Sequence, residues 1–446
     1  MIGSPPVPRV VPEAPTGRVV GGPGDPGTRL LSGPAAGPEP LASHVARLGL
    51  LAPPVRLATL LDTVAASGLR GRGGGGFPSA AKLEAARRAM GAPLIIVNAA
   101  ESEPASRKDH VLGTHRPHLL LDGAATVAAL VGSSEVVVHA HRNEAGGALL
   151  QAVDRAVEER RAAGVADPRW LLSAGPDAYV SGEASAVASF VSGGEARPWF
   201  SGNRMAARGP TGRPTVVTNA ETVAHIGYLA HVGLEGWWAA DSPDGPRLVT
   251  LAGAVATPGA VVEVGGRATL GDILHRAGWS EPPAAVLVGG YAGTWIDGPT
   301  AWWTRFDHPG LERVGARPGC GLVAVLPHGA CGLAETARLA RYLAGQSAGQ
   351  CGPCVLGLPG VADGTEALAA GHLRRRGLDR LGTLAASVVG RGACSHPDGV
   401  AHLVGSALRV FADDVARHVA GAPCDGAGHP PVLAVPADAP TPSVWR

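Results

Sequence analysis

Short apolar runs that alternate with helix-like segments dominate the first half of this 446-residue chain. A continuous aliphatic run of this length is typical of a strand buried on both faces of a parallel sheet. Four such runs are found, at Leu94–Val97, Glu135–His139, Trp170–Leu172 and Pro214–Val217. Helix-like stretches such as 118–131 and 144–163 separate them, so the pattern predicts an α/β domain with a mostly parallel sheet.

Polar side chains follow several of these runs. Asn98, Glu101 and Glu103 come after the first run, Glu183 after the third, and Asn219 after the fourth. Ligands of open α/β sheets bind at the carboxyl ends of the strands. Each of these residues alone would suit an ordinary surface loop, but their shared placement predicts a common binding site.

A glycine-rich stretch, Gly68–Lys82 (GLRGRGGGGFPSAAK), precedes the first strand. Glycine allows positive φ and close approach of the backbone to a ligand, and successive N–H groups in such a loop can form an anion-binding nest. A helix expected from about Ser79 would add the partial positive charge of its N-terminus. A flexible linker would be rich in serine and would lack Phe-Pro and lysine. We therefore interpret the stretch as a phosphate cradle that uses Gly71, Arg72, Gly73 and Gly74.

Lysine usage points to the same region. The chain has 38 basic residues, of which two, Lys82 and Lys108, are lysines. A lysine in a chain that otherwise uses arginine suggests a site that needs a compact ammonium group.

Composition excludes several classes of function. A formal net charge of +1 argues against nucleic acid or an anionic membrane surface as a partner. No apolar run reaches the roughly 18 residues of a transmembrane helix. Residues 1–27 are rich in proline and glycine and lack the apolar segment of a signal peptide, so we expect them to be disordered. Six cysteines in so long a chain do not form a disulfide framework, which indicates a cytoplasmic protein.

The second half of the chain has a different pattern. Strand-like runs at 248–251, 261–264 and 285–288 surround one helix at 270–277, which predicts a small α+β domain. From residue 332 the chain becomes helical, with a helix at 335–344. A later helix is marked by a regular apolar face of Val404, Leu408, Phe411, Val415 and Val419. We expect five regions: a disordered segment 1–27, an α/β domain 28–245, an α+β domain 246–330, a helical domain 331–422 and a flexible tail 423–446.

Three cysteines have the spacing of a metal site. Cys351 and Cys354 form a Cys-x-x-Cys, and Cys394 with His396 follows forty residues later. Thiolates bind zinc or iron–sulfur clusters, and three cysteines with one histidine would satisfy tetrahedral zinc. Spacing alone leaves zinc, an iron–sulfur cluster and no metal open. Cys320, Cys331 and Cys424 lack such spacing and are expected to be small hydrophobic residues.

Five motifs, in order, resemble the flavoprotein subunit of NADH:quinone oxidoreductase (respiratory complex I). The motifs are Gly68–Lys82, Val97–Asp109, Ala178–Ala186, Arg213–Thr222 and Ser347–Cys354. The resemblance implies an FMN-binding α/β domain, a β-grasp domain of the soluble-ligand-binding (SLBB) type and an α-helical iron–sulfur domain. It also implies hydride transfer from NAD(P)H to FMN and single-electron transfer through a 4Fe–4S cluster.

The resemblance also implies roles for individual residues. The loop around Gly71–Gly74, with Arg72, would hold the FMN phosphate and ribityl chain, and Lys82 would lie near the flavin. Asn98 and Asn219 would hydrogen-bond the flavin. The side facing NADH would be lined by Phe77, Glu103, Tyr179 and Glu183. The cluster would be ligated by Cys351, Cys354 and Cys394.

Several positions depart from the family pattern. Two carboxylates are replaced, by Ala100 and Ala184, the first asparagine of an Asn-Asn pair is Thr218, and the first cluster cysteine is Ala348. A Lys-Pro-Pro-Phe-Pro element is not recognisable in 198–208. These changes predict a divergent paralogue, which would be an NAD(P)H dehydrogenase-type enzyme subunit serving a ferredoxin or a quinone-reducing partner. The alternative is a non-catalytic scaffold or electron-transfer subunit that has lost NADH binding and carries structural zinc.

Overall fold

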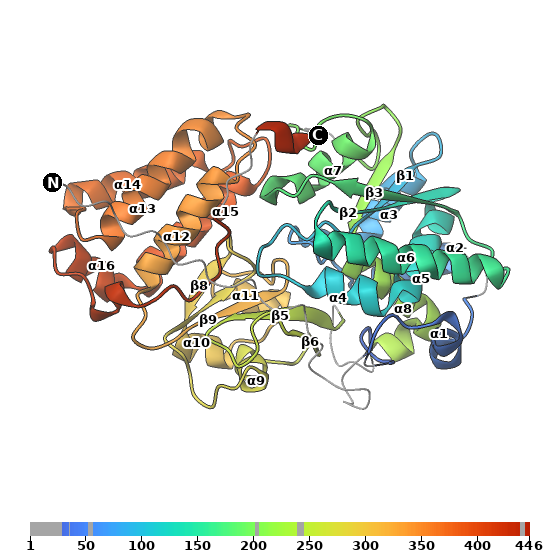
Figure 1. The fold of residues 1–446 in the computed structure, drawn as a ribbon, viewed down its shortest axis with the longest axis horizontal. Helices are drawn as coiled ribbons and strands as arrows, with labels where there is room; N and C mark the ends of the chain where they lie inside the picture. Colours follow the sequence, from blue (N-terminus) through green and yellow to red (C-terminus); the bar gives the residue numbers. More distant parts are fainter. Residues whose placement is uncertain (1–28, 35, 52–56, 201–204, 239–244, 438–441) are drawn as a thin grey trace.

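A computed structural model describes residues 29–34, 36–51, 57–200, 205–238, 245–437 and 442–446. The segment 1–27, for which the sequence predicts disorder, lies outside the described residues. Figure 1 shows the α/β region at one end of an elongated molecule, a mixed sheet below the middle, and a bundle of helices at the other end.

The N-terminal sheet is parallel throughout, as the sequence predicts. It has the strand order β3-β2-β1-β4. The strands are β1 (Leu94–Asn98), β2 (Glu135–His141), β3 (Arg169–Gly175) and β4 (Thr215–Asn219). Asn98 and Asn219 are directly paired in the register of β1 and β4. The two asparagines that end the apolar runs therefore lie side by side at the carboxyl edge of the sheet.

Helices cover both faces of this sheet. They are α1 (Leu41–Leu48), α2 (Leu57–Ala66), α3 (Ser79–Arg87), α4 (Lys108–His115), α5 (Pro117–Val131), α6 (Glu144–Ala162), α7 (Ala184–Val191) and α8 (Ala220–Trp238). Ile95 and Val97 of β1 face the core formed with α5, α6 and α8, whereas Ile96 faces the core formed with α7. A Cβ at Gly123 of α5 would lie 1.9 Å from the carbonyl oxygen of Val223 in α8. The glycine therefore allows the backbones of these two helices to touch.

The middle region is a five-stranded mixed sheet with the order β6-β5-β9-β7-β8. Its strands are β5 (Arg247–Gly253), β6 (Val261–Val264), β7 (Ala285–Val288), β8 (Thr294–Asp297) and β9 (Leu322–Leu326), and its helices are α9 (Leu270–Arg276), α10 (Gly298–Trp303) and α11 (His308–Glu312). Strands β5 and β9 are parallel and the other pairs are antiparallel. The sequence did not predict β8 or the central strand β9.

Residues 29–31 cross the end of β6 without forming a strand. The backbone N–H groups of Leu30 and Leu31 donate instead to the carboxylate of Glu263, at 3.1 and 3.0 Å. A buried side chain on β6 thus replaces the strand partner that these N–H groups would otherwise need.

The C-terminal region is helical. It contains α12 (Gly332–Gly345), α13 (Leu358–Ala369), α14 (Arg375–Val388), α15 (His396–Val410) and α16 (Ala412–Val419). The apolar face that predicted one helix across 404–419 is divided at Phe411, whose backbone leaves helical geometry (φ −102°, ψ 35°). The Phe411 ring packs edge-on against Trp295 at 5.5 Å and would clash with a Cβ at Gly332.

The described parts of the tail pack onto the protein, although the sequence predicts a flexible segment over 423–446. Leu433 is buried, and its N–H and that of Val432 donate to the carboxylate of Glu335. Trp445 is 3% exposed, its carbonyl accepts from Ala196 N at 2.9 Å, and the Arg197 guanidinium lies over its ring. The proline-rich composition predicted flexibility, but buried apolar contacts and a cation–π contact hold these described residues against the rest of the protein.

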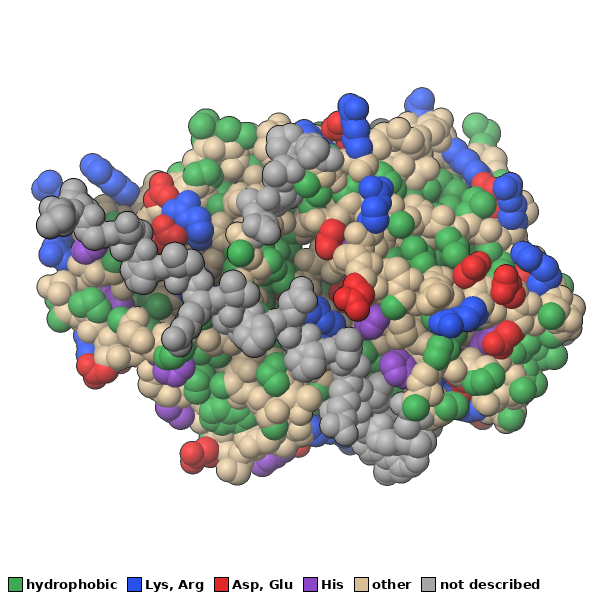
Figure 2. Space-filling model, viewed as in Figure 1, with side chains coloured by type: hydrophobic (Ala, Val, Ile, Leu, Met, Phe, Trp, Pro, Cys, Tyr) green, Lys and Arg blue, Asp and Glu red, His purple; other side chains and the backbone are tan. Residues whose placement is uncertain are grey.

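Figure 2 shows basic and acidic side chains scattered together over the visible face. Within the described residues, no helix is both long enough and apolar enough to cross a membrane.

Candidate functional site

The glycine-rich loop is held at both ends by its own backbone. Gly71 N donates to Phe77 O at 2.9 Å, and Ser79 N donates to Leu69 O at 3.0 Å. The inner side of the loop rests on the end of β4, because a Cβ at Gly73 would lie 3.1 Å from Cβ of Asn219. Gly73 therefore permits a close approach between the loop and the strand end.

The outer side of the same loop is open. Cβ atoms built at Gly74 and Gly75 would meet no described atom within 4 Å, and Gly74 has a φ of +105° that favours glycine. Helix α3 starts directly after the loop, and its N-terminus has no side-chain cap among the described residues. An anion placed above the loop would meet backbone N–H groups and the positive end of a helix. The loop therefore fits the phosphate of a cofactor.

Arg72 does not point into this open space. Its side chain is 1% exposed, Nη2 donates to Pro246 O at 3.1 Å, and its backbone N donates to Thr222 Oγ1 at 2.8 Å. Its charge lies behind the loop and helps to lower the pKa of the buried Glu221. The side chain thus supports the loop from below, whereas the sequence assigned it a direct part in holding phosphate.

Both lysines converge on the end of β4. Lys82 Nζ donates to Val217 O at 3.0 Å, and burial lowers its pKa. Lys108 Nζ lies 2.9 Å from Asp109, 3.0 Å from Glu221 and 3.3 Å from Asn219 Oδ1. Burial disfavours the Lys108 charge, but the two carboxylates outweigh burial and raise its pKa. Sequence reasoning missed this buried ion cluster. The scarcity of lysine in the chain was the one signal that could have pointed to Lys108.

The two paired asparagines are fixed by different neighbours. Asn98 Nδ2 donates to Gly182 O at 2.9 Å, which ties β1 to the turn that carries Glu183. Asn219 Nδ2 donates to Asp109 Oδ2 at 2.7 Å, while its Oδ1 accepts from Lys108. The loop, the two asparagines and the Glu183 turn thus form one continuous edge.

Glu101 and Glu103 have separate environments. The Glu101 carboxylate accepts from Ser106 Oγ at 2.5 Å and from the backbone of α4 at Asp109 N and His110 N, so it serves as a cap for that helix.

Glu103 is 7% exposed and lies where the α/β domain meets the mixed sheet. Its Oε2 accepts from Tyr179 Oη at 3.2 Å and from Tyr291 N at 2.9 Å, while Oε1 has no hydrogen-bond partner among the described residues. Burial raises the pKa of Glu103 to about 8. Phe77, another of the four residues predicted for this side, is 51% exposed on the loop. A ligand could use the spare oxygen of Glu103.

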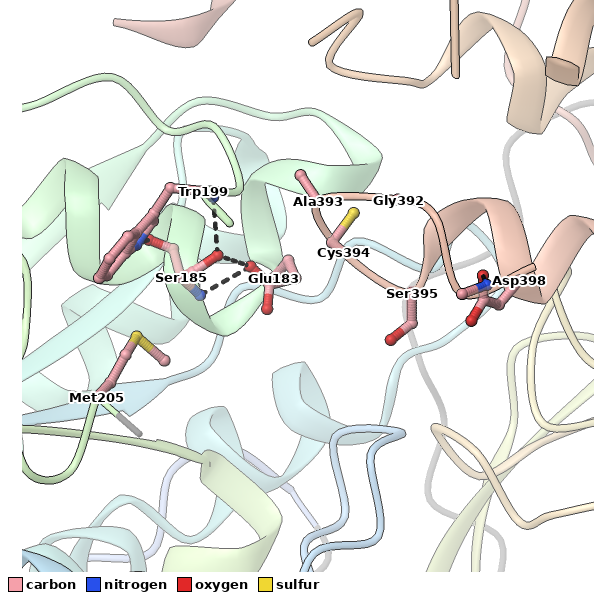
Figure 3. A pocket seen from close by; sticks show the side chains of 10 residues that line it. Glu183, Ser185, Trp199, Met205, Gly392, Ala393, Cys394, Ser395 and Asp398 are labelled. Atoms are coloured by element: carbon pink, nitrogen blue, oxygen red, sulfur yellow. Dashed lines mark hydrogen bonds between the residues drawn. The ribbon is translucent and has the colours of Figure 1, made fainter. Parts of the chain in front are cut away.

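A cavity of about 320 Å³ lies between the α/β domain and the helical region, as Figure 3 shows. One wall is formed by Glu183, Ser185, Trp199 and Met205, and the other by the turn from Gly390 to Asp398, which includes Cys394. Glu183 caps α7 by accepting from Ser185 N at 2.8 Å. The cavity therefore joins the Glu183 turn, at the carboxyl edge of the sheet, to Cys394.

The three predicted cluster cysteines are mutual neighbours. Burial raises the pKa of the Cys354 thiol, and Cys351 and Cys394 lie close enough to raise it further. The three sulfurs are described but do not all lie within 4.8 Å of one another. A single tetrahedral zinc ion would hold its sulfurs about 3.8 Å apart, from Zn–S bonds of about 2.3 Å. The wider spacing favours a cluster in which each thiolate binds a different iron atom.

The His396 ring is anchored through one of its two nitrogens. Its Nε2 donates to Leu343 O at 2.8 Å, and its buried Nδ1 has no hydrogen-bond partner among the described residues. Ala348, at the position of the first family cysteine, packs instead near Val180 and Trp445.

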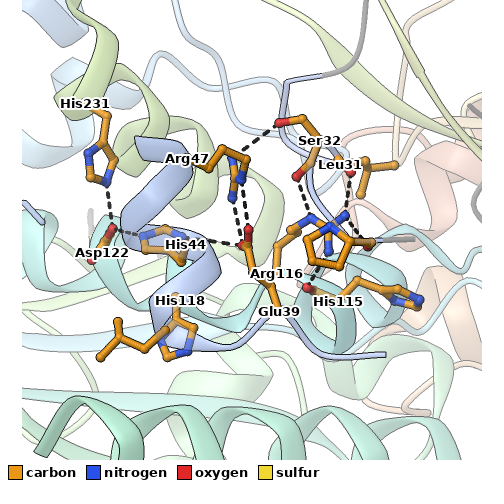
Figure 4. Close-up of polar contacts among 12 residues, drawn as sticks. Leu31, Ser32, Glu39, His44, Arg47, His115, Arg116, His118, Asp122 and His231 are labelled. Atoms are coloured by element: carbon orange, nitrogen blue, oxygen red, sulfur yellow. Dashed lines mark hydrogen bonds and ion pairs between the residues drawn. The ribbon is translucent and has the colours of Figure 1, made fainter. Parts of the chain in front are cut away.

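Two further groups of metal-ligand side chains are compact. In the first, shown in Figure 4, Asp122 accepts from His44 at 2.8 Å and from His231 at 2.7 Å. Arg160 Nη1 also donates to Asp122, at 2.7 Å. These donors lower the pKa of Asp122 even though burial opposes ionisation, so the group is a satisfied ion network. The second group is Cys331, His418 and Cys424.

Comparison with known families gives two matches in chain order. Residues 64–228 match the Nuo51 FMN-binding domain, and residues 334–418 match the NADH-ubiquinone oxidoreductase-F iron-sulfur binding region.

Relatives align with most of the chain. The F subunit of the NADH-quinone oxidoreductase of Streptomyces coelicolor is 29% identical over 385 residues, covering 82% of this chain and 84% of that relative. One of the F subunits of Rhizobium meliloti is 28% identical, with 81% and 88% covered. An NAD⁺-reducing NiFe-hydrogenase in its H₂-reduced state has a chain with TM-score 0.73 and 29% identity over 82% of this chain. This protein spans about three-fifths (62%) of that hydrogenase chain.

The two family models, their order and the length of these alignments confirm the resemblance seen in the sequence. The chain therefore carries an FMN-binding region and an iron–sulfur binding region of the NADH-quinone oxidoreductase type, and it is similar over most of its length to F subunits of NADH-quinone oxidoreductases.

Proposed function

We propose that this protein is a flavin-dependent NAD(P)H oxidoreductase subunit, which accepts hydride on FMN and passes single electrons through an iron–sulfur site to a partner. The observation that carries the proposal is the continuity of the site. The glycine loop, Asn219, Asn98 and the Glu183 turn form one edge, and a cavity connects that edge to Cys394.

The flavin would bind above the loop. The N–H groups of Gly71 and Arg72 already donate to Phe77 O and Thr222 Oγ1, so the backbone of Gly73 and Gly74 would hold its phosphate. The outer face of the loop is open there, and helix α3 begins directly after the loop. The paired Asn98 and Asn219, with Lys82 beside β4, would position the ring system. When bound, FMN supplies hydride acceptance and one-electron release.

The nicotinamide nucleotide would enter on the side of Phe77, Glu103, Tyr179 and Glu183. Phe77 is exposed and could cover a planar ring. Glu103 offers an oxygen without a partner in the described structure, and Tyr179 holds the other oxygen in place. Glu101, which the sequence also assigned to cofactor binding, would act through the position of α4.

The cluster would be held by Cys351, Cys354 and Cys394. His396 is a suitable fourth ligand, because Nδ1 is buried and Nε2–H is already engaged by a carbonyl, which fixes the tautomer. A water or thiol is the other option. These ligands would set a 4Fe–4S cluster on the far side of the cavity from Glu183.

We further propose that the mixed sheet, with α9 packed on one face, is the β-grasp SLBB-type domain implied by the family resemblance. The domain limits 28–245, 246–330 and 331–422 follow the same scheme. The partner would be a ferredoxin-like or complex I-like subunit, and the protein would work in the cytoplasm, attached to any membrane complex through that partner. The six free cysteines agree with a reducing compartment.

Anaerobic purification followed by visible spectroscopy tests this function. We expect flavin bands and broad iron–sulfur absorbance, both bleached by NADH or NADPH. A protein that stays colourless after reconstitution with FMN, iron and sulfide would contradict the proposal. Parallel titrations with the two nucleotides would establish which one is the substrate.

The second candidate is an electron-transfer subunit that no longer binds NADH. It is favoured by Ala100 and Ala184, which replace carboxylates of the family pattern beside the site. A lost charged hydrogen bond costs about 1.5–3 kcal/mol, so two losses would slow NADH oxidation by orders of magnitude. This candidate predicts a flavin that dithionite reduces and NADH does not.

A further inference from the structure

We propose that Cys331, His418 and Cys424 form a second metal site, which binds Zn²⁺ and is separate from the Cys351–Cys354–Cys394 group. Their ligand atoms all lie within 4.8 Å of one another, and all three residues are buried. Cys331 Sγ is 3.9 Å from His418 Nε2. Each of the cysteines is free.

The imidazole of His418 is oriented as in metal sites. Its Nδ1 lies 3.1 Å from the carbonyl oxygen of Leu368, so this nitrogen carries the proton. The lone pair is therefore on Nε2, which faces the sulfurs and accepts from Cys424 N at 3.0 Å. A backbone carbonyl that fixes the ring tautomer in this way is the usual outer partner of a histidine ligand.

The distances suit zinc. Bonds of about 2.3 Å to sulfur and about 2.0 Å to nitrogen at tetrahedral angles place the two ligand atoms about 3.5 Å apart. The observed 3.9 Å needs a small contraction, and Nε2 would exchange the Cys424 N–H for the ion. Two thiolates would neutralise the charge of Zn²⁺, and a water would complete the four positions.

The surroundings differ from those of the histidine network around Asp122. There Arg160 donates to the carboxylate and occupies the place of a cation. The hydrogen-bond partners of the cysteine group are backbone atoms, including Ala334 N, which donates to Cys331 Sγ at 3.4 Å from the first turn of α12.

The site would join two loops that are far apart in the sequence. Cys331 lies between β9 and α12, and Cys424 lies after α16. The loops already touch, because a Cβ at Gly426 would lie 2.6 Å from Gly329 O. A bound ion would therefore fasten the end of the helical region to the mixed sheet without taking part in electron transfer.

Metal analysis of the full-length protein tests the assignment. Zinc and iron would be measured by mass spectrometry after anaerobic, chelator-free purification from cells supplied with both metals. We expect about one zinc per chain. Cys331→Ser and Cys424→Ser should lose at least nine-tenths of the zinc and keep the iron, whereas Cys351→Ser should lose iron and keep this zinc.

Three outcomes would overturn the proposal: wild type without zinc, zinc retained in both serine variants, or a Cys331–Cys424 disulfide in non-reducing peptide maps. If the variants do not fold, zinc-edge X-ray absorption of the wild type decides. Two sulfurs and one imidazole nitrogen at the zinc support the site, and a shell of three sulfurs contradicts it.

Discussion

The two cysteine groups of this protein differ in spacing and in access. Cys351, Cys354 and Cys394 are spread, and Cys394 borders a cavity that also reaches Glu183. The Cys331 group is compact, buried and surrounded by backbone partners. The first arrangement suits a polynuclear cluster that exchanges electrons, and the second suits one small ion. Ligand spacing and exposure thus separate a redox role from a structural one, even though both groups are built from the same residue types.

The largest effect is expected when a cysteine is removed from the group of Cys351, Cys354 and Cys394. Cys354→Ser should abolish iron binding, because Cys354 is the buried member that the other two flank. Iron per chain would be measured after anaerobic reconstitution, with Cys320→Ser as the control. Equal loss of iron in both variants would show that the cluster is not at Cys354.

The second test asks whether the flavin end is independent of both metals. Gly73→Val should weaken FMN binding, because the new Cβ meets Asn219 Cβ at 3.1 Å, so the loop or the strand end must shift. Fluorescence titration would give the affinity. Gly147→Val is the matched control, since a Cβ at Gly147 meets no described atom within 4 Å. Unchanged FMN affinity in Gly73→Val would place the flavin elsewhere.

The third test restores the family ligand. Ala348→Cys should raise iron content and lengthen the lifetime of the cluster in air several-fold, because a fourth thiolate replaces a labile position. Ala348→Ser adds similar volume without a thiolate and serves as the control. Ala348 packs near Trp445. Equal iron content and equal cluster lifetime in the two variants would therefore show that the segment around Trp445 keeps the side chain of residue 348 away from the cluster.

The smallest effect concerns the buried carboxyl of Glu103, which lies between Tyr179 and Tyr291. Burial raises the pKa of Glu103 to about 8, so between about pH 4.5 and 8 the unfolded chain is ionised while the folded chain stays protonated. The protonated Glu103 carboxyl therefore stabilises the flavin-free protein to its full extent only below about pH 4.5. That contribution is lost as the pH rises to 8, by at most about 1.4 kcal/mol per pH unit.

Glu103→Gln should remove this slope, because the amide does not ionise. Denaturant midpoints of wild type and variant would be compared at pH 5, 6, 7 and 8. Two curves that run parallel over this range would show that Glu103 is ionised in the folded protein.

The sequence predicted the parallel sheet because buried strands of aliphatic residues and the helices between them have distinct periods. It also placed Asn98 and Asn219 at one edge, because strand ends in a parallel sheet share that edge. The direction of Arg72 could not be predicted, since it depends on Pro246, a residue of the next domain. The folding of β9 at the centre of the mixed sheet likewise depends on partners distant in the sequence.

The compact metal group was invisible for a related reason. His418 and Cys424 are six residues apart and lack a familiar spacing, and Cys331 is distant from both. Contacts between chain ends and loops, such as that of Gly426 with Gly329, bring them together. Sequence reasoning treated Cys331 and Cys424 as unrelated hydrophobic residues, whereas the structure places them in one group with His418.

The pairing of β1 with β4 has a consequence for the order in which the molecule assembles. Asn98 and Asn219 lie 121 positions apart, and β4 is the edge strand of its sheet. Pairing across such a separation is slow, because the entropy of the long intervening chain is lost before the strands gain any contact energy. The glycine-rich loop therefore gains its contact with Asn219 only once β4 has formed beside β1. A chain halted before that step would expose the unpaired side of β1, a surface prone to aggregation. Flavin supply during biosynthesis should thus govern how much protein reaches the native state, in addition to how much of it is active.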